Sequence, residues 1–176
     1  DDPLLSTFIG YPDTALARLV FHELAHQVVY VKDDTSFNEA FATAVEEAGL
    51  ARWLAAQAGT PGHAALVAEA ERGKRLREGF RQWMREARAE LEALYASGAS
   101  DAEQRAGKAA VFERMRAAYE AAKAGESGLA GYDRWFAGHD GQGPNNASIA
   151  AVALYDDKVP AFRALLAQAG GDLPAF

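Results

Sequence analysis

Residues 13–30 have the sequence DTALARLVFHELAHQVVY, and this stretch decides the fold. Pro12 and Asp13 in front of it are typical of a helix start. Apolar side chains then recur every three or four residues, which predicts an amphipathic helix. We expect the buried face of this helix to consist of Leu16, Leu19, Val20, Leu24 and Val28.

The remainder of the chain is also predicted to be helical, so the expected fold class is all-α. Alanine accounts for 40 of the 176 residues, and alanine is the strongest helix former. After a polar turn at 32–36, Thr35 or Ser36 is expected to cap a second helix, which Gly59 and Pro61 end. Further helices are expected at about 61–96, 100–124, 146–157 and 160–170.

The length is typical of a single domain, here residues 1–176. The helices within 61–124 are long, amphipathic and separated by a short turn, so we expect a long antiparallel helical hairpin inserted into that domain. Ser100-Asp101-Ala102-Glu103 has the pattern of a capping box for the second arm. Because the chain opens with Asp1 rather than Met, we expect it to be a processed or trimmed piece of a longer protein.

Composition excludes several classes of function. There is no cysteine, which rules out disulfides, cysteine-bound zinc and a thiol nucleophile. The net charge of −7 argues against nucleic acid as the main partner. No apolar run approaches the roughly 18 residues that a membrane-spanning helix needs.

The first helix carries the chemistry, in the pentapeptide His22-Glu23-Leu24-Ala25-His26. Residues at i and i+4 lie on one helix face, so both imidazoles can bind one zinc ion. Glu23 then lies beside the metal, where it can take a proton from zinc-bound water. This is the H-E-x-x-H arrangement of zinc peptidases.

A catalytic zinc needs a third protein ligand and an open fourth position. Glu39 is the favoured candidate, because antiparallel packing of the second helix would bring its first turn toward His26. Glu46 shares the face of Glu39 and is the alternative, and His63 and His139 are further options. Thr43 or Glu46 is expected to orient a ligand histidine through its second ring nitrogen.

His22-Glu23-x-x-His26 followed by Asn38-Glu39-Ala40-Phe41-Ala42 resembles the gluzincin group of zinc peptidases, in which a second helix carries the third ligand. Residues 2–49, and Asn145-Asn146-Ala147 with Tyr155 and residues 159–162, resemble more closely a bacterial family of predicted aminopeptidases, often lipoproteins. The resemblance implies hydrolysis of peptides by one zinc ion per chain, with His22, His26 and Glu39 as ligands and Glu23 as base. It also implies a preceding N-terminal half, so that this chain is the C-terminal part of the protein, and a place in the bacterial cell envelope, the cytoplasm being the alternative.

The C-terminal part supplies candidates for substrate contacts. Tyr155 lies in the family-like segment and is the first choice as donor to the tetrahedral oxyanion; Tyr30, Tyr132 and His139 are alternatives. Asn145 and Asn146 either bind a peptide backbone or cap a helix. His139 is a candidate for a lid over the site, and Glu46, Glu47 and Asp140 are candidates for binding a substrate amine.

Two other functions remain open on the sequence alone. In the first, zinc only joins the two helices of a non-catalytic module and the hairpin binds a partner protein. A base at Glu23 would have no purpose there. In the second, the enzyme is a zinc endopeptidase, which differs from an aminopeptidase only in its substrate cleft. The oligomeric state and the substrate side chain are not predicted.

Overall fold

The structure is a computed structural model that describes residues 8, 10–138, 141, 143–156 and 158–176, without the side chains of 153–156. Within these residues the chain is helical and forms no strand, which confirms the expected all-α class. None of the helices in the described part is long and apolar enough to cross a membrane.

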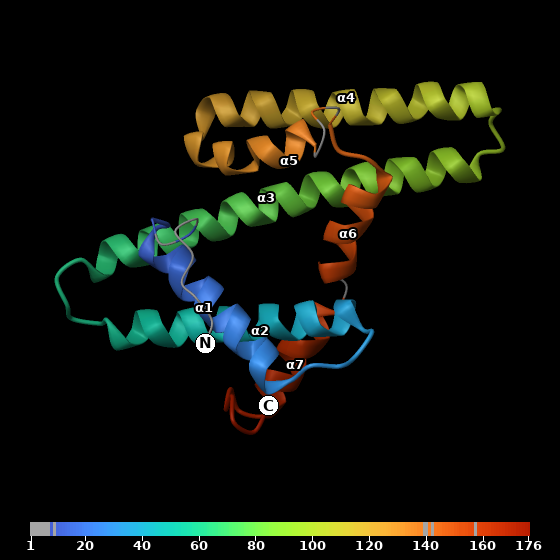
Figure 1. Cartoon of the computed structure of the whole chain (residues 1–176). Helices are drawn as coiled ribbons and strands as arrows, with labels where there is room; N and C mark the ends of the chain where they lie inside the picture. Colours follow the sequence, from blue (N-terminus) through green and yellow to red (C-terminus); the bar gives the residue numbers. More distant parts are fainter. Residues whose placement is uncertain (1–7, 9, 139–140, 142, 157) are drawn as a thin grey trace. The chain divides into compact units, whose positions relative to one another are not determined.

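The six helices expected from the sequence begin and end close to the expected residues, and the structure adds two short ones between residues 127 and 137 that were not expected (Figure 1). Glycine and proline end the second helix where the sequence predicts, because neither continues a helix well. The elements in chain order are α1 (Asp13–Val28), α2 (Thr35–Ala56), α3 (His63–Ala96), α4 (Asp101–Gly125), the 3-10 helix η1 (Ser127–Tyr132), α5 (Asp133–Ala137), α6 (Asn146–Asp156) and α7 (Val159–Gln168).

The chain divides into two compact units. The first unit comprises Asp1–Gly73 and Leu154–Phe176, and the second comprises Lys74–Ala153. His22, His26, Glu39 and Glu46 all lie in the first unit. The expectation of one catalytic domain with an excursion at 61–124 stays a prediction.

Small side chains let α1 and α2 pack closely in the first unit. Ala25 of α1 and Ala40 and Ala44 of α2 are buried. The ring of Phe21 lies so close to Gly49 that a Cβ there would come within 2.5 Å of it, so only glycine fits at this crossing. Phe162 of α7 packs edge-on against two α2 rings to complete the core, those of Phe37 and Phe41.

The expected buried face of α1 is wrong for three of its five residues, while Leu16 and Leu19 are half-buried. Val20, Leu24 and Val28 are 39%, 54% and 79% exposed. The face that meets α2 instead carries Ala25 and the largely covered Arg18 and His22. Polar side chains with partners on α2 occupy the packing side, and apolar periodicity alone cannot detect this.

The start of α2 also differs from expectation. Asp34, rather than Thr35 or Ser36, is the N-cap, and its carboxylate accepts a hydrogen bond from the Phe37 amide at 2.9 Å. Lys158, just before α7, donates to both Asp34 oxygens at 3.1 and 3.2 Å. The Asp34 carboxylate therefore caps the first turn of α2 and connects that helix to α7.

Replacing Asp34 by asparagine should keep the helix cap, because both residues cap well. The substitution should remove the stabilisation that the negative charge of Asp34 gives to the fold. The Phe37 amide and then Lys158 lower the pKa of Asp34. Its ionised form therefore stabilises the fold above the unfolded pKa of about 3.9, and this stabilisation is lost as the pH falls through the folded pKa. We expect Asp34→Asn to lower the Tm at pH 7 and to match the parent near pH 2.

The control for this measurement is Asp33→Asn, at the exposed neighbouring residue. Asp33 has a φ of 64°, a conformation that asparagine adopts readily. A Tm difference for Asp34→Asn that stayed constant from pH 7 to pH 2 would contradict the assigned role of its charge.

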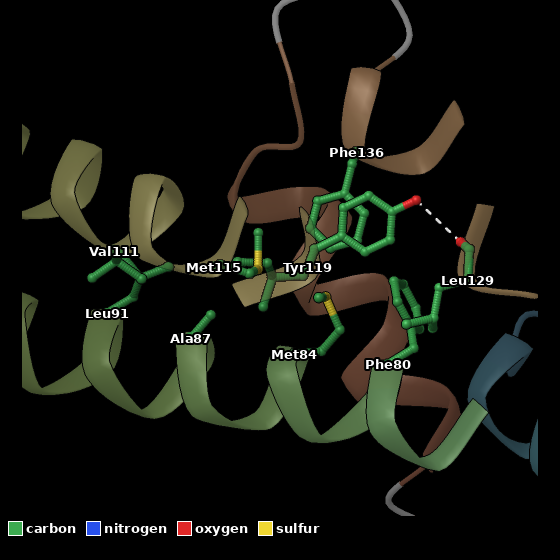
Figure 2. Packing of buried hydrophobic residues seen from close by; sticks show 10 residues of the cluster. Phe80, Met84, Ala87, Leu91, Val111, Met115, Tyr119, Leu129 and Phe136 are labelled. Atoms are coloured by element: carbon green, nitrogen blue, oxygen red, sulfur yellow. Dashed lines mark hydrogen bonds between the residues drawn. The ribbon is translucent and has the colours of Figure 1, made fainter. Parts of the chain in front are cut away.

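The second unit contains a hydrophobic core between α3 and α4, which run antiparallel (Figure 1). Figure 2 shows Met84, Leu91 and Phe80 of α3 facing Met115 and Tyr119 of α4. The Tyr119 hydroxyl donates to the Asp133 carboxylate at 2.5 Å and lies 3.0 Å from the Leu129 carbonyl oxygen. The predicted capping box of α4 is confirmed at Ser100 and Glu103.

Candidate metal centre

Three side chains from α1 and α2 converge in the first unit. His22 and His26 lie one turn apart on α1, and Glu39 lies in the first part of α2. The two Nε2 atoms are 3.2 Å apart, and Glu39 oxygens lie 3.2 Å from Nε2 of His22 and 3.8 Å from Nε2 of His26. Among the described residues, this trio forms a group whose ligand atoms could hold one metal ion.

The two distances of 3.2 Å are close to the spacing in a tetrahedral zinc site, and the distance of 3.8 Å is longer. Zinc bonds of about 2.0–2.1 Å place neighbouring ligand atoms about 3.3 Å apart in a tetrahedron. The ring nitrogens and the Glu39 oxygens that face one another carry lone pairs, which repel unless a proton or a cation lies between them. The side chains of His22, His26 and Glu39 are 19%, 20% and 30% exposed, so solvent reaches the group.

Glu46 lies on the opposite side of the His22 ring. One of its oxygens is 3.2 Å from Nδ1 of His22, while Nε2 faces the group. The hydrogen bond to Glu46 is the largest influence on His22 and raises its pKa against the opposing effect of burial. Glu39 therefore lies at Nε2 of His22, the nitrogen that faces His26, and Glu46 lies at Nδ1, where a residue that orients the ring is expected.

Arg18 completes this part of the site and was not among the sequence candidates. It pairs with the second oxygen of Glu46. Arg18 precedes His22 by one helical turn, so the two share a face of α1. This spacing is the signal in the sequence that could have indicated Arg18. Its partner Glu46, however, lies 28 residues further along the chain, where no local pattern connects the two.

His26 has a different environment. Its Nδ1 atom is buried without a hydrogen-bond partner among the described residues. The ring instead contacts that of His22 edge-on, with centroids 4.9 Å apart. The position of His26 therefore depends mainly on the helix and on its neighbour.

Asn38, next to Glu39, fixes the connection between the two helices. Its side-chain oxygen accepts from the Val31 amide at 2.7 Å, and its amide nitrogen donates to the Val31 carbonyl at 2.8 Å. Asn38 is buried, so these bonds are shielded from water. The sequence pairs Asn38 with Glu39 but gives no indication of this structural role.

Comparison with known proteins gives a family for the chain. All residues, 1–176, match the family described as "Putative aminopeptidase". The chain belongs to this family. Searches of curated proteins and of solved structures returned no match.

The aminopeptidase family match covers residues 22–26 and the remaining candidates, which the structure places as follows. Glu23 is exposed on α1, directly after His22. Thr43 is buried on α2, and it is Glu46 that contacts the second nitrogen of His22. His63 begins α3 and lies outside the group of three.

Several candidates lie in the second unit or outside the residues that the structure describes. Asn145 caps α6, because its side-chain oxygen accepts a hydrogen bond from the Ser148 amide at 3.1 Å. The side-chain amide of Asn146 donates a hydrogen bond to the Tyr95 hydroxyl at 3.0 Å. The Tyr132 ring stacks on Phe80 at 4.2 Å. His139, Asp140 and the side chain of Tyr155 lie outside the described residues.

Tyr30 and Glu47 are the remaining candidates, both in the first unit of this aminopeptidase-family chain. Tyr30 is exposed in the connection after α1. Glu47 is paired with Arg163 of α7 through two hydrogen bonds of 2.7 Å. A substrate amine would therefore compete with Arg163 for that carboxylate.

Proposed function

We propose that this member of the aminopeptidase family is a zinc-dependent peptidase that removes N-terminal residues from peptides. His22, His26 and Glu39 would hold one zinc ion per chain. The observation that carries the proposal is the convergence of the two Nε2 atoms and the Glu39 carboxylate, at 3.2–3.8 Å, next to a helix position, Glu23, whose side chain is exposed. The family match supports the peptidase class.

The metal and the chain would supply different parts of the chemistry. Bound zinc supplies Lewis acidity to the attacking water and to the scissile carbonyl. Glu23 would take a proton from that water and deliver it to the leaving amine. Its exposure leaves the carboxylate accessible to water and to a substrate.

The chain also orients the ligands and the substrate. Glu46 accepts a hydrogen bond from Nδ1 of His22 and so directs Nε2 toward His26 and Glu39. Tyr155 is our proposed donor to the oxyanion that forms during peptide hydrolysis. Of the candidates for binding the free amine, Glu46 and Glu47 already have partners in the first unit.

A purely structural zinc site is less well supported. Such a site encloses the metal with four protein ligands. The group in the described residues offers three, and solvent reaches it. The position of Glu23 beside the first ligand has no explanation in a structural site.

The test is hydrolysis of an aminoacyl-p-nitroanilide and of its N-acetylated form by the zinc-loaded chain. We expect cleavage of the free-amine substrate only, loss of that activity on chelation, and recovery when zinc is restored. Equal cleavage of both substrates would favour the endopeptidase alternative. A chain that holds one zinc and cleaves neither substrate, nor a longer peptide, would contradict the proposal.

A further inference from the structure

Arg18 and Glu46 form an ion pair that links α1 to α2 directly behind the candidate ligands. Their side chains are only 12% and 9% exposed. Burying two charges is costly, and their attraction offsets that cost only when the geometry is good and the remaining polar atoms are bonded. A buried pair at this place therefore requires an explanation beyond general stability.

The two oxygens of Glu46 have different partners. Arg18 donates to Oε1 through Nη2, and Nδ1 of His22 lies 3.2 Å from Oε2. With both oxygens bonded, the carboxylate has one orientation. Without Arg18, Oε1 would have no counter-charge and the carboxylate would be free to rotate away from His22.

We propose that Arg18 is a positioning residue of the metal centre: it holds Glu46 so that Glu46 keeps Nε2 of His22 facing His26 and Glu39. This inference rests on the proposed function. Arg18 has no contact with substrate or metal in this role, and its effect reaches the site only through Glu46.

The environment of His26 makes this support more important. The buried Nδ1 of His26 has no partner among the described residues, so His22 is the histidine held by a carboxylate from behind. Partners of this kind typically change metal affinity by about 10- to 100-fold. We therefore expect the affinity of the site to depend strongly on Arg18.

The chain contains a matched control for this pair. Arg163 of α7 and Glu47 of α2 also form an arginine–carboxylate pair, but it is more exposed. Glu47 follows Glu46 directly, so its side chain points about 100° away around the helix. Arg163→Met removes a similar interaction from the same helix without touching His22.

The experiment measures zinc affinity by chelator competition, and the Tm of the metal-free protein, for the parent chain, Arg18→Met and Arg163→Met. We expect Arg18→Met to bind zinc about 10- to 100-fold more weakly and Arg163→Met to stay within about twofold of the parent. NMR of the zinc-loaded chain should show the Hδ1 proton of His22 at the downfield chemical shift of a hydrogen-bonded proton. We expect this shift to be lost in Arg18→Met and kept in Arg163→Met. Unchanged affinity in a folded Arg18→Met variant would overturn the proposal.

A second variant covers the case in which Arg18→Met does not fold, since it leaves a buried charge unpaired. Arg18→Met with Glu46→Met replaces the pair by apolar side chains, which is often tolerated. We expect it to fold without metal and still to bind zinc about 10- to 100-fold more weakly. Parent-like affinity, or failure of this variant to fold too, would show that the pair is merely structural.

The outcome also separates this inference from the proposed function. If the parent chain binds zinc and loses it in Glu39→Ala, the metal centre is established whatever the Arg18 variants do. Parent-like affinity in those variants then overturns the positioning role alone. A parent chain that binds no zinc overturns both.

Discussion

Glu23→Gln should bind zinc as tightly as the parent chain and lose about 10²- to 10⁴-fold in peptidase activity. The amide has the size of the carboxylate but cannot accept a proton from water. Glu23 is exposed on α1, so the substitution should leave the fold intact. The measurement is kcat/KM on a free-amine substrate, with zinc content determined on the same samples.

A charge-matched control separates loss of the base from loss of one negative charge. Glu71 is exposed in the part of α3 that belongs to the first unit, and Glu71→Gln should keep full activity. Activity retained in Glu23→Gln would contradict the assignment of Glu23 as the base. Activity lost together with zinc would mean that Glu23 supports the metal instead.

Glu39→Ala should weaken zinc binding by about 10²- to 10³-fold. This estimate assumes that each of four ligands contributes one quarter of the free energy of zinc binding. Only the two histidines would remain as protein ligands. The helix should persist, because alanine favours it and the cap at Asp34 is separate. Chelator competition measures the affinity, and the Tm of the metal-free variant checks the fold.

Two further alanine variants make this result specific. Glu47→Ala removes a carboxylate of the same helix that pairs with Arg163, and zinc affinity should not change. Glu46→Ala should weaken binding less than Glu39→Ala, because Glu46 contacts the far nitrogen of His22. A variant series in which Glu46→Ala abolished binding and Glu39→Ala did not would assign Glu46 as the ligand.

The helices were predictable because their ends have strong local signals. Gly59 and Pro61 follow α2, and Ser100 and Glu103 start α4 with a capping box. The long α3 has apolar residues in a regular stripe, and Phe80 and Leu91 from that stripe are buried. Each of these signals depends on neighbours within a few residues, which the sequence displays directly.

The face of α1 was not predictable in the same way. Its apolar residues Val20, Leu24 and Val28 are exposed, while Ala25 is buried against α2. Periodicity assumes that the most apolar side packs inside. On α1 the packing side instead carries polar groups whose partners are on α2, and only the folded arrangement reveals those partners.

The candidate site was likewise predictable only where its residues lie within one helix. The spacing of His22 and His26 within one helix was sufficient to place both on one face. Glu39 and Glu46 share a face of α2 and differ by about 10 Å along it. Which of them meets the imidazoles depends on how far α1 is displaced along α2, and no sequence pattern records that displacement.

X-ray absorption of the zinc-loaded chain tests the central claim most directly, because it counts the imidazoles bound to the metal. The account predicts one zinc per chain in a shell of four nitrogen and oxygen atoms, with scattering from two imidazole rings. His22→Ala should reduce the two rings to one or release the metal. A chain that retains no zinc, or a zinc shell without imidazole scattering, would contradict the proposed site.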